Sequence, residues 1–146
     1  MPHLIRSVEE RAYLAGVLDG EGTFIIRRGR DATHGYKFQA VVRVTNTSWE
    51  LIAWLHATFG GNVVRERDRR PNRKPCWLWS LDGGTLVVPV VQQVLPYLRV
   101  KRRQAEVVLE FYKVRNPFGK RVSYGEWARR AALREDLCLL NRKGIA

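Results

Sequence analysis

Two acidic side chains lie close together where a predicted helix ends. The segment Leu14–Gly22 has the sequence LAGVLDGEG, in which Asp19 and Glu21 follow an apolar stretch and alternate with glycines. The C-terminal end of a helix carries partial negative charge, so two carboxylates there are unfavourable unless a cation neutralises them. A cation site is one explanation of the pattern. The alternative is that the acids are solvated and the glycines only terminate the helix.

Small side chains precede these acids at helical spacing. Ala12, Ala15, Gly16 and Asp19 are three or four residues apart, which places them along one stripe of a helix. A stripe of small residues allows a second helix to approach closely. We therefore expect a helix–helix interface along this stripe.

The charge of the chain indicates a polyanionic partner. Its 146 residues include 26 basic and 14 acidic side chains, giving a formal net charge of +12. A surface with this excess attracts phosphates, so nucleic acid is the expected partner. No apolar run reaches the roughly 18 residues that a membrane-spanning helix needs, and we expect a soluble, intracellular protein. The two cysteines and three histidines show no zinc-ligand or disulfide pattern.

The elements that must position these residues follow from capping signals and periodicity. Capping boxes are predicted at Ser7 with Glu10, Thr47 with Glu50, and Ser123 with Glu126. Helices are expected over residues 8–19, 48–59, 85–95, 102–115 and 124–140. Period-two segments predict strands over 23–28, 36–45, 62–69 and 76–81. We expect one domain, residues 1–146, because no shift in composition marks a boundary.

Basic and amide side chains recur at alternate positions of the predicted strands. We expect them on one sheet face, where a two-stranded ribbon could contact base edges in a major groove. These residues are Arg27, Lys37, Gln39, Arg43, Arg65, Arg67 and Arg69. Phosphate contacts are expected from Arg70, from Arg73–Lys74 and from the cluster Arg99–Arg103, in particular from Arg103. A solvated strand face is the alternative.

The segment Leu14–Gly22 resembles the LAGLIDADG motif of homing endonucleases. Leu14, Ala15, Gly16 and Asp19 match the motif, and Glu21 stands at its catalytic acid position. The order helix, hairpin, helix, hairpin is also that of the family. Residues 96–105 resemble the stretch that supplies an active-site lysine, here Lys101, in small homodimeric members.

This resemblance implies an α+β, αββαββα fold with a four-stranded antiparallel DNA-binding saddle and helices on the opposite face. It implies a homodimer that cuts both strands of a long, pseudo-palindromic DNA site and leaves 3′ overhangs. Mg²⁺, for which Mn²⁺ can substitute, would be held by Glu21 and the carbonyl of Gly20. Lys101 would stabilise the transition state, and Asn46 stands where relatives often have a glutamine that positions water. Glu50 stands where some relatives carry a basic active-site residue. Arg103 is another residue that could supply this basic group.

Two other classes of protein stay open at this stage. A non-catalytic relative could bind intron RNA as a maturase or bind DNA as a regulator. A structural RNA-binding protein would explain the charge of +12 but not a helix that ends in acids. The family implies either a bacterial cytoplasm or an organelle matrix as the compartment.

Overall fold

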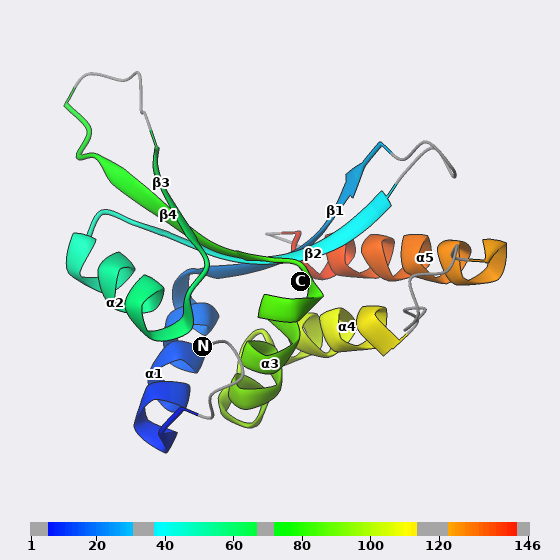
Figure 1. Ribbon diagram of the computed structural model, residues 1–146, viewed down its shortest axis with the longest axis horizontal. Helices are drawn as coiled ribbons and strands as arrows, with labels where there is room; N and C mark the ends of the chain where they lie inside the picture. The colour runs from blue at the N-terminus through cyan, green and yellow to red at the C-terminus, as the bar shows by residue number, and fades with distance from the viewer. Residues whose placement is uncertain (1–5, 31–36, 67–71, 114–122, 143–146) are drawn as a thin grey trace.

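A curved antiparallel sheet forms one layer of the molecule and the helices form the other. The computed structural model describes residues 6–30, 37–66, 72–113 and 123–142. In this part of the chain the helices lie on one side of the sheet, and the opposite side is open (Figure 1). The predicted α+β class is confirmed.

The order of elements is the predicted one. In chain order they are α1 (Val8–Glu21), β1 (Gly22–Gly29), β2 (Lys37–Asn46), α2 (Trp49–Phe59), β3 (Asn62–Glu66), β4 (Cys76–Asp82), α3 (Gly84–Val94), the 3-10 helix η1 (Leu95–Tyr97), α4 (Arg102–Lys113) and α5 (Tyr124–Leu140). No helix in the described ranges is long and apolar enough to cross a membrane.

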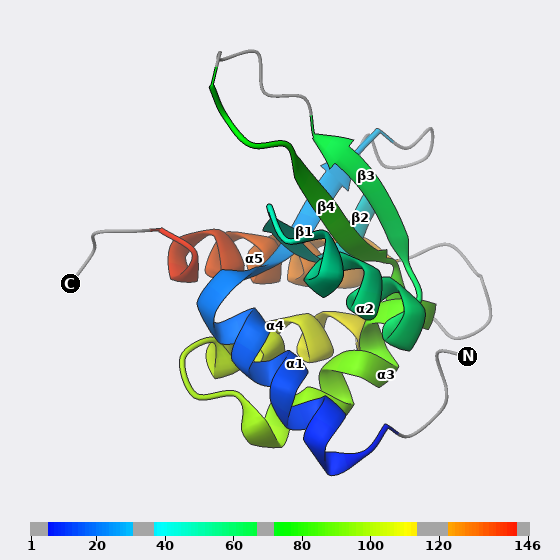
Figure 2. The same cartoon turned by 90° about the vertical axis from the view of Figure 1, so that its left-hand side faces the viewer.

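The four strands pair in the order β1-β2-β4-β3, and each pair is antiparallel. The β1–β2 and β3–β4 hairpins rise at opposite ends of the sheet, so its open side has the shape of a saddle (Figures 1 and 2). The register sets Val44 opposite Trp79 on β4 and Trp79 opposite Val63 on β3. Alternate side chains therefore face the helices across the whole sheet.

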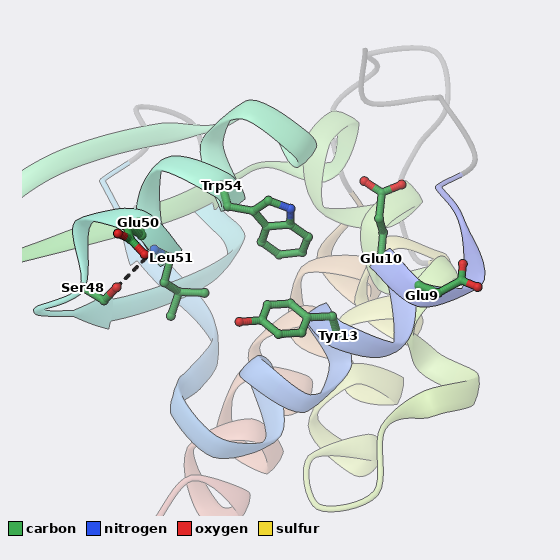
Figure 3. Close-up of a pocket in the computed structure, with 7 residues that line it drawn as sticks. All are labelled: Glu9, Glu10, Tyr13, Ser48, Glu50, Leu51 and Trp54. Carbon is green, nitrogen blue, oxygen red and sulfur yellow. Dashed lines mark hydrogen bonds between the residues drawn. The ribbon is translucent and has the colours of Figure 1, made fainter.

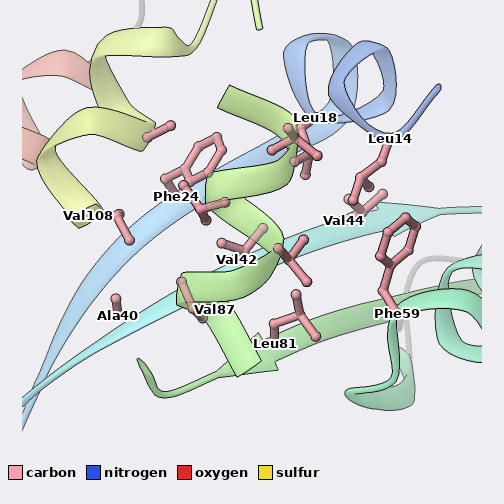
Figure 4. Close-up of a cluster of buried hydrophobic side chains, with 14 of the residues drawn as sticks. Leu14, Leu18, Phe24, Ala40, Val42, Val44, Phe59, Leu81, Val87 and Val108 are labelled. Atoms are coloured by element: carbon pink, nitrogen blue, oxygen red, sulfur yellow. The ribbon is translucent and has the colours of Figure 1, made fainter. Parts of the chain in front are cut away.

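The core lies between the sheet and the helices. Phe24 and Val42 from the sheet, Leu14 and Leu18 from α1, and Val87 from α3 are fully buried in it (Figure 4). Burial of one such side chain stabilises the fold by roughly 1.5–3 kcal/mol. This apolar contact fixes α1 against the sheet, so the end of α1 has a defined position.

The helix boundaries differ from the predicted ones at two informative places. The first helix does not stop at Gly20 but continues through Glu21, and Gly22 is its C-cap. The predicted capping box at Thr47 is wrong, because the side chain of Ser48 is the one that accepts the N–H of Leu51, at 3.3 Å. The predicted capping box at Ser7 is confirmed.

Candidate active site and sheet face

Glu21 is the last helical residue of α1, and its side chain is exposed. The amide nitrogen of Asn46, at the end of β2, donates a hydrogen bond to the Glu21 carboxylate. The amide oxygen of Asn46 in turn accepts the backbone N–H of Ser48 at 2.7 Å. The start of α2 thus orients Asn46, and Asn46 orients Glu21.

Lys101 reaches the same end of α1 from a distant part of the chain. It precedes α4, it is partly buried, and its ammonium group donates a hydrogen bond to the backbone carbonyl of Gly22. A cation at a helix C-terminus offsets the negative end of the helix dipole. The structure therefore brings the three predicted catalytic residues, Glu21, Asn46 and Lys101, to one helix end.

Asp19 holds the loop that carries Lys101. Its carboxylate accepts the backbone N–H groups of Arg99 at 2.9 Å, Val100 at 3.0 Å and Lys101 at 2.9 Å. Asp19 was predicted to lie in a helix–helix interface, but these contacts are within the chain. No sequence signal predicts this pairing, because the partners of Asp19 are about 80 residues away.

The end of α1 offers oxygen ligands only. The carboxylate of Glu21 is exposed, and the carbonyl of Gly20 belongs to the last turn, where carbonyls lack helical partners. No cluster of three or more histidine, cysteine or acidic side chains suited to a metal occurs within the described ranges. This donor set fits Mg²⁺, which keeps several waters and binds through one or two carboxylates together with substrate phosphates.

The exposed strip of α1 differs from the predicted stripe. Ala15 is fully buried in the chain's own core, so its predicted place in an interface between helices of two chains is wrong. Ala12, Gly16 and Gly20 are exposed at a spacing of four residues, and no heavy atom lies within 4 Å of a Cβ built on either glycine. A strip without side-chain bulk therefore faces outward along the helix.

An acidic groove of about 490 Å³ lies between α1 and α2, beside this strip. The Tyr13 ring from α1 meets the Trp54 ring from α2 edge to face, with centroids 4.9 Å apart (Figure 3). Glu50 lines the groove and not the end of α1 where Lys101 lies. The carboxylates around it make the groove unsuited to a phosphate backbone.

Four predicted DNA-contacting residues lie on the open sheet face. Lys37, Gln39 and Arg43 alternate with core residues of β2, and Arg27 lies opposite Gln39 on β1. The guanidinium of Arg27 donates to the Gln39 side-chain oxygen from Nε at 3.0 Å and from Nη2 at 2.5 Å. This pairing restrains both side chains.

Arg65 lies on the other face, contrary to the prediction. It pairs with Trp77 and shares its side of β3 with Val63, and both of these pack against the core. The open-face residues of β3 are Asn62, Val64 and Glu66, none of which was a predicted DNA contact. The predicted contacts Arg67, Arg69 and Arg70 are outside the described residues. Arg103 is exposed in the first turn of α4.

Known proteins are similar to this chain in sequence and in fold. No family model matches the chain. The chain is 27% identical over 106 residues to DNA endonuclease I-CvuI of Chlorella vulgaris, a match that covers 70% of this chain and 63% of that protein. It therefore spans less than two thirds of that relative's length.

Solved structures give the same result for the fold. A structure of I-CvuI in complex with a DNA target and Mg has a TM-score of 0.75 at 23% identity, covering 94% of this chain and 86% of that one. The archaeal intron-encoded homing endonuclease I-Vdi141I, complexed with DNA, has a TM-score of 0.77 at 19% identity, covering 94% and 87%. The LAGLIDADG meganuclease I-CpaMI, bound to uncleaved DNA, has 0.69 at 12%, covering 93% and 51%.

The chain therefore has the fold of these homing endonucleases. The LAGLIDADG-like segment Leu14–Gly22 forms the C-terminal part of α1 and its C-cap, and the chain is similar in sequence to I-CvuI. The resemblance inferred from the sequence is confirmed.

Proposed function

We propose that this protein is a site-specific DNA endonuclease that acts as a homodimer and uses Mg²⁺. The observation that carries the proposal is the convergence of Glu21, Asn46 and Lys101 at one end of a sheet face with basic and amide side chains. The similar proteins support it, because I-CvuI and I-Vdi141I are homing endonucleases solved with DNA.

In this proposal Glu21 and the carbonyl of Gly20 hold the metal ion, since they are the oxygen donors at the end of α1. Bound there, Mg²⁺ would supply Lewis-acid stabilisation of the phosphate and a lower pKa for an attacking water. Asn46 fixes the orientation of the Glu21 carboxylate through its hydrogen bond. Mn²⁺ is expected to substitute, because it also prefers carboxylate, carbonyl and water ligands.

Lys101 stabilises the negative charge that develops on the phosphate in the transition state. Its ammonium group is already placed at the α1 end by the Gly22 carbonyl and by the Asp19 contact to its own backbone. A charge that is held in place before the reaction costs no reorganisation when the phosphate charge develops. Arg27, Lys37 and Gln39 hold the DNA over the saddle.

Cleavage of both DNA strands calls for two copies of the chain. Each copy supplies one Glu21, and the chain covers only 51% of I-CpaMI although 93% of its own length is matched. The exposed strip of Ala12, Gly16 and Gly20 allows the α1 helices of two copies to pack closely. An isologous dimer presents two equivalent faces, so the site would be long and pseudo-palindromic.

The test begins with selection of bound duplexes from a randomised palindromic library without divalent metal. Mg²⁺ is then added to the recovered DNA, and the products are mapped on both strands. We expect double-strand cuts with 3′ overhangs at the centre of the selected site. Glu21→Gln should bind the same DNA without cutting it. Glu135→Gln is the matched control, because Glu135 is an exposed acid of α5 far along the chain from the site.

The outcomes separate this proposal from the alternative classes. Specific binding without metal-dependent cutting by the unmodified protein would identify a non-catalytic DNA-binding relative. Affinity for structured RNA that exceeds affinity for every selected duplex would favour an RNA-binding role. Cutting that persists in Glu21→Gln would show that the metal is held elsewhere.

A further inference from the structure

The strand registers arrange the open sheet face in rows that run across the strands. From the β1–β2 hairpin toward the β3–β4 hairpin, the rows are Arg27–Gln39, Ile25–Val41–Asp82, Thr23–Arg43–Ser80–Asn62, Thr45–Leu78–Val64, and Cys76–Glu66 on β4 and β3. The rows differ in chemistry. Those of Arg27 and Arg43 carry hydrogen-bonding groups, whereas the row of Val64 presents methyl groups.

This apolar row is accessible from the open side of the sheet. Val64 is 56% exposed, Thr45 is exposed and Leu78 is half-buried. The neighbouring rows are polar on both sides, with Arg43 in one and Glu66 in the other. An apolar strip one side chain wide between polar rows is too narrow for a protein interface, but it matches a small apolar group on an otherwise polar surface.

We infer that the row Thr45–Leu78–Val64 recognises the 5-methyl group of thymine in the bound DNA. The inference rests on the proposed function, because it assumes that a major groove lies over this face. Thymine is the one natural base that presents a methyl group in that groove, and apolar side chains and threonine methyls are its usual contacts. Base pairs over this row are therefore selected for thymine, while those over Arg27–Gln39 are selected by hydrogen bonds.

The registers also place these base pairs relative to the cut. Thr45 directly precedes Asn46, which binds Glu21, whereas Gln39 lies six residues before Thr45 in β2, toward the β1–β2 hairpin. Six strand residues span about 20 Å, or about six base pairs at 3.4 Å each. The methyl-recognised pairs should therefore lie about six pairs nearer the cleaved bonds than the pairs under Gln39.

The experiment measures binding to duplexes in which single thymines are replaced by uracil, a change that removes only the methyl group. The starting duplex is the one selected in the test of function, and binding is measured by fluorescence anisotropy without divalent metal. Loss of one buried methyl group corresponds to about 0.8 kcal/mol, or about a fourfold weaker affinity. We expect this loss at one or two inner pairs of each half-site.

Two variants test which residues are responsible. Val64→Ala and Thr45→Ser each shorten an exposed side chain by methyl groups and leave the core of the sheet unchanged. In at least one of them the thymine-to-uracil ratio of affinities should fall from about fourfold to near one at an inner pair. Leu139→Ala, at an exposed leucine of α5, is the control and should keep the unmodified ratio.

Several results would overturn the inference and leave the proposed function intact. These are specific binding and cutting with no uracil-sensitive pair, an inner half-site that contains no thymine, sensitivity confined to the outer pairs, or a ratio unchanged in both variants. Failure to select any specific duplex would overturn the proposed function and this inference together.

Discussion

Replacement of Asp19 by asparagine should destabilise the fold and weaken cleavage at the same time. Oδ1 of Asp19 accepts the N–H groups of Val100 and Lys101, and Oδ2 accepts that of Arg99. An asparagine offers one oxygen, so its NH₂ group would oppose one of these N–H donors. Hydrogen bonds to charged groups contribute about 1.5–3 kcal/mol each, and neutral ones about half as much.

The expected loss for Asp19→Asn is about 2 kcal/mol, from the lower part of that range because Asp19 is only half-buried. For a domain of this size the melting temperature should fall by about 4–8 °C. Thermal unfolding followed by circular dichroism measures it. Cleavage of the selected site should fall more than binding, because the loop that carries Lys101 is loosened.

Glu21→Gln is the matched control, since it makes the same chemical change two residues later. Glu21 is exposed and lies at the negative end of α1, so loss of its charge should leave stability unchanged or raise it by about 0.3–1 kcal/mol. A melting temperature of Asp19→Asn within about 1 °C of the unmodified protein would refute the reasoning. Equal destabilisation by both variants would refute it too.

Three further changes have definite expected outcomes. Lys101→Met should abolish cutting at saturating DNA and Mg²⁺ while specific binding persists, and cutting at the unmodified rate would remove Lys101 from the mechanism. Gly16→Leu should fold but elute at the monomer mass of 16.9 kDa, since no atom of the described residues lies within 4 Å of a Cβ there; a persisting dimer would place the interface elsewhere. Gly84→Ala should lower stability by about 1–3 kcal/mol, because its Cβ would lie 2.7 Å from the Tyr112 ring. Gly125→Ala, in open space, should cost nothing, and chemical denaturation compares the two.

The sequence predicted the elements well where a periodic pattern and a capping signal coincided. The capping box at Ser7 and the N-cap at Ser123 start their helices as expected. The cap of α2 was misplaced because Thr47 and Ser48 are adjacent and both can cap. The structure distinguishes them, because Ser48 has extended backbone angles before the helix and its side chain accepts the N–H of Leu51.

The face of Arg65 could not be predicted from alternation alone. Val63 and Val64 are consecutive, so either valine could face the core, and a shift of one residue moves every side chain of β3 to the other face. Pairing with β4 decides the register, because it sets Val63 opposite Trp79. The row of Val64 was not predicted for the same reason, because a strand with Arg65 on the open face has Val64 on the opposite face.

The small residues of α1 posed a similar ambiguity. Ala15 lies three residues and Gly16 four residues after Ala12, so spacing alone places both on one stripe with Ala12. In the structure, however, Ala15 is fully buried and Gly16 is exposed. The sheet and α3, which are distant in sequence, determine which side of α1 is covered. The proposed catalytic residues were selected through the family resemblance, but their contacts depend on pairings across 25 to 82 residues.

The last turn of α1 explains why the proposed active site can be precise although it is built from distant segments. Successive helical residues point about 100° apart, so Leu18 faces the core, Asp19 faces the Lys101 loop and Gly20 faces outward. Glu21 follows on the same turn. Because Asp19 binds the loop that carries Lys101, any small movement of α1 displaces Glu21 and Lys101 together and preserves their relative position. Packing of two α1 helices through their exposed glycines would therefore position both catalytic groups of each copy at once.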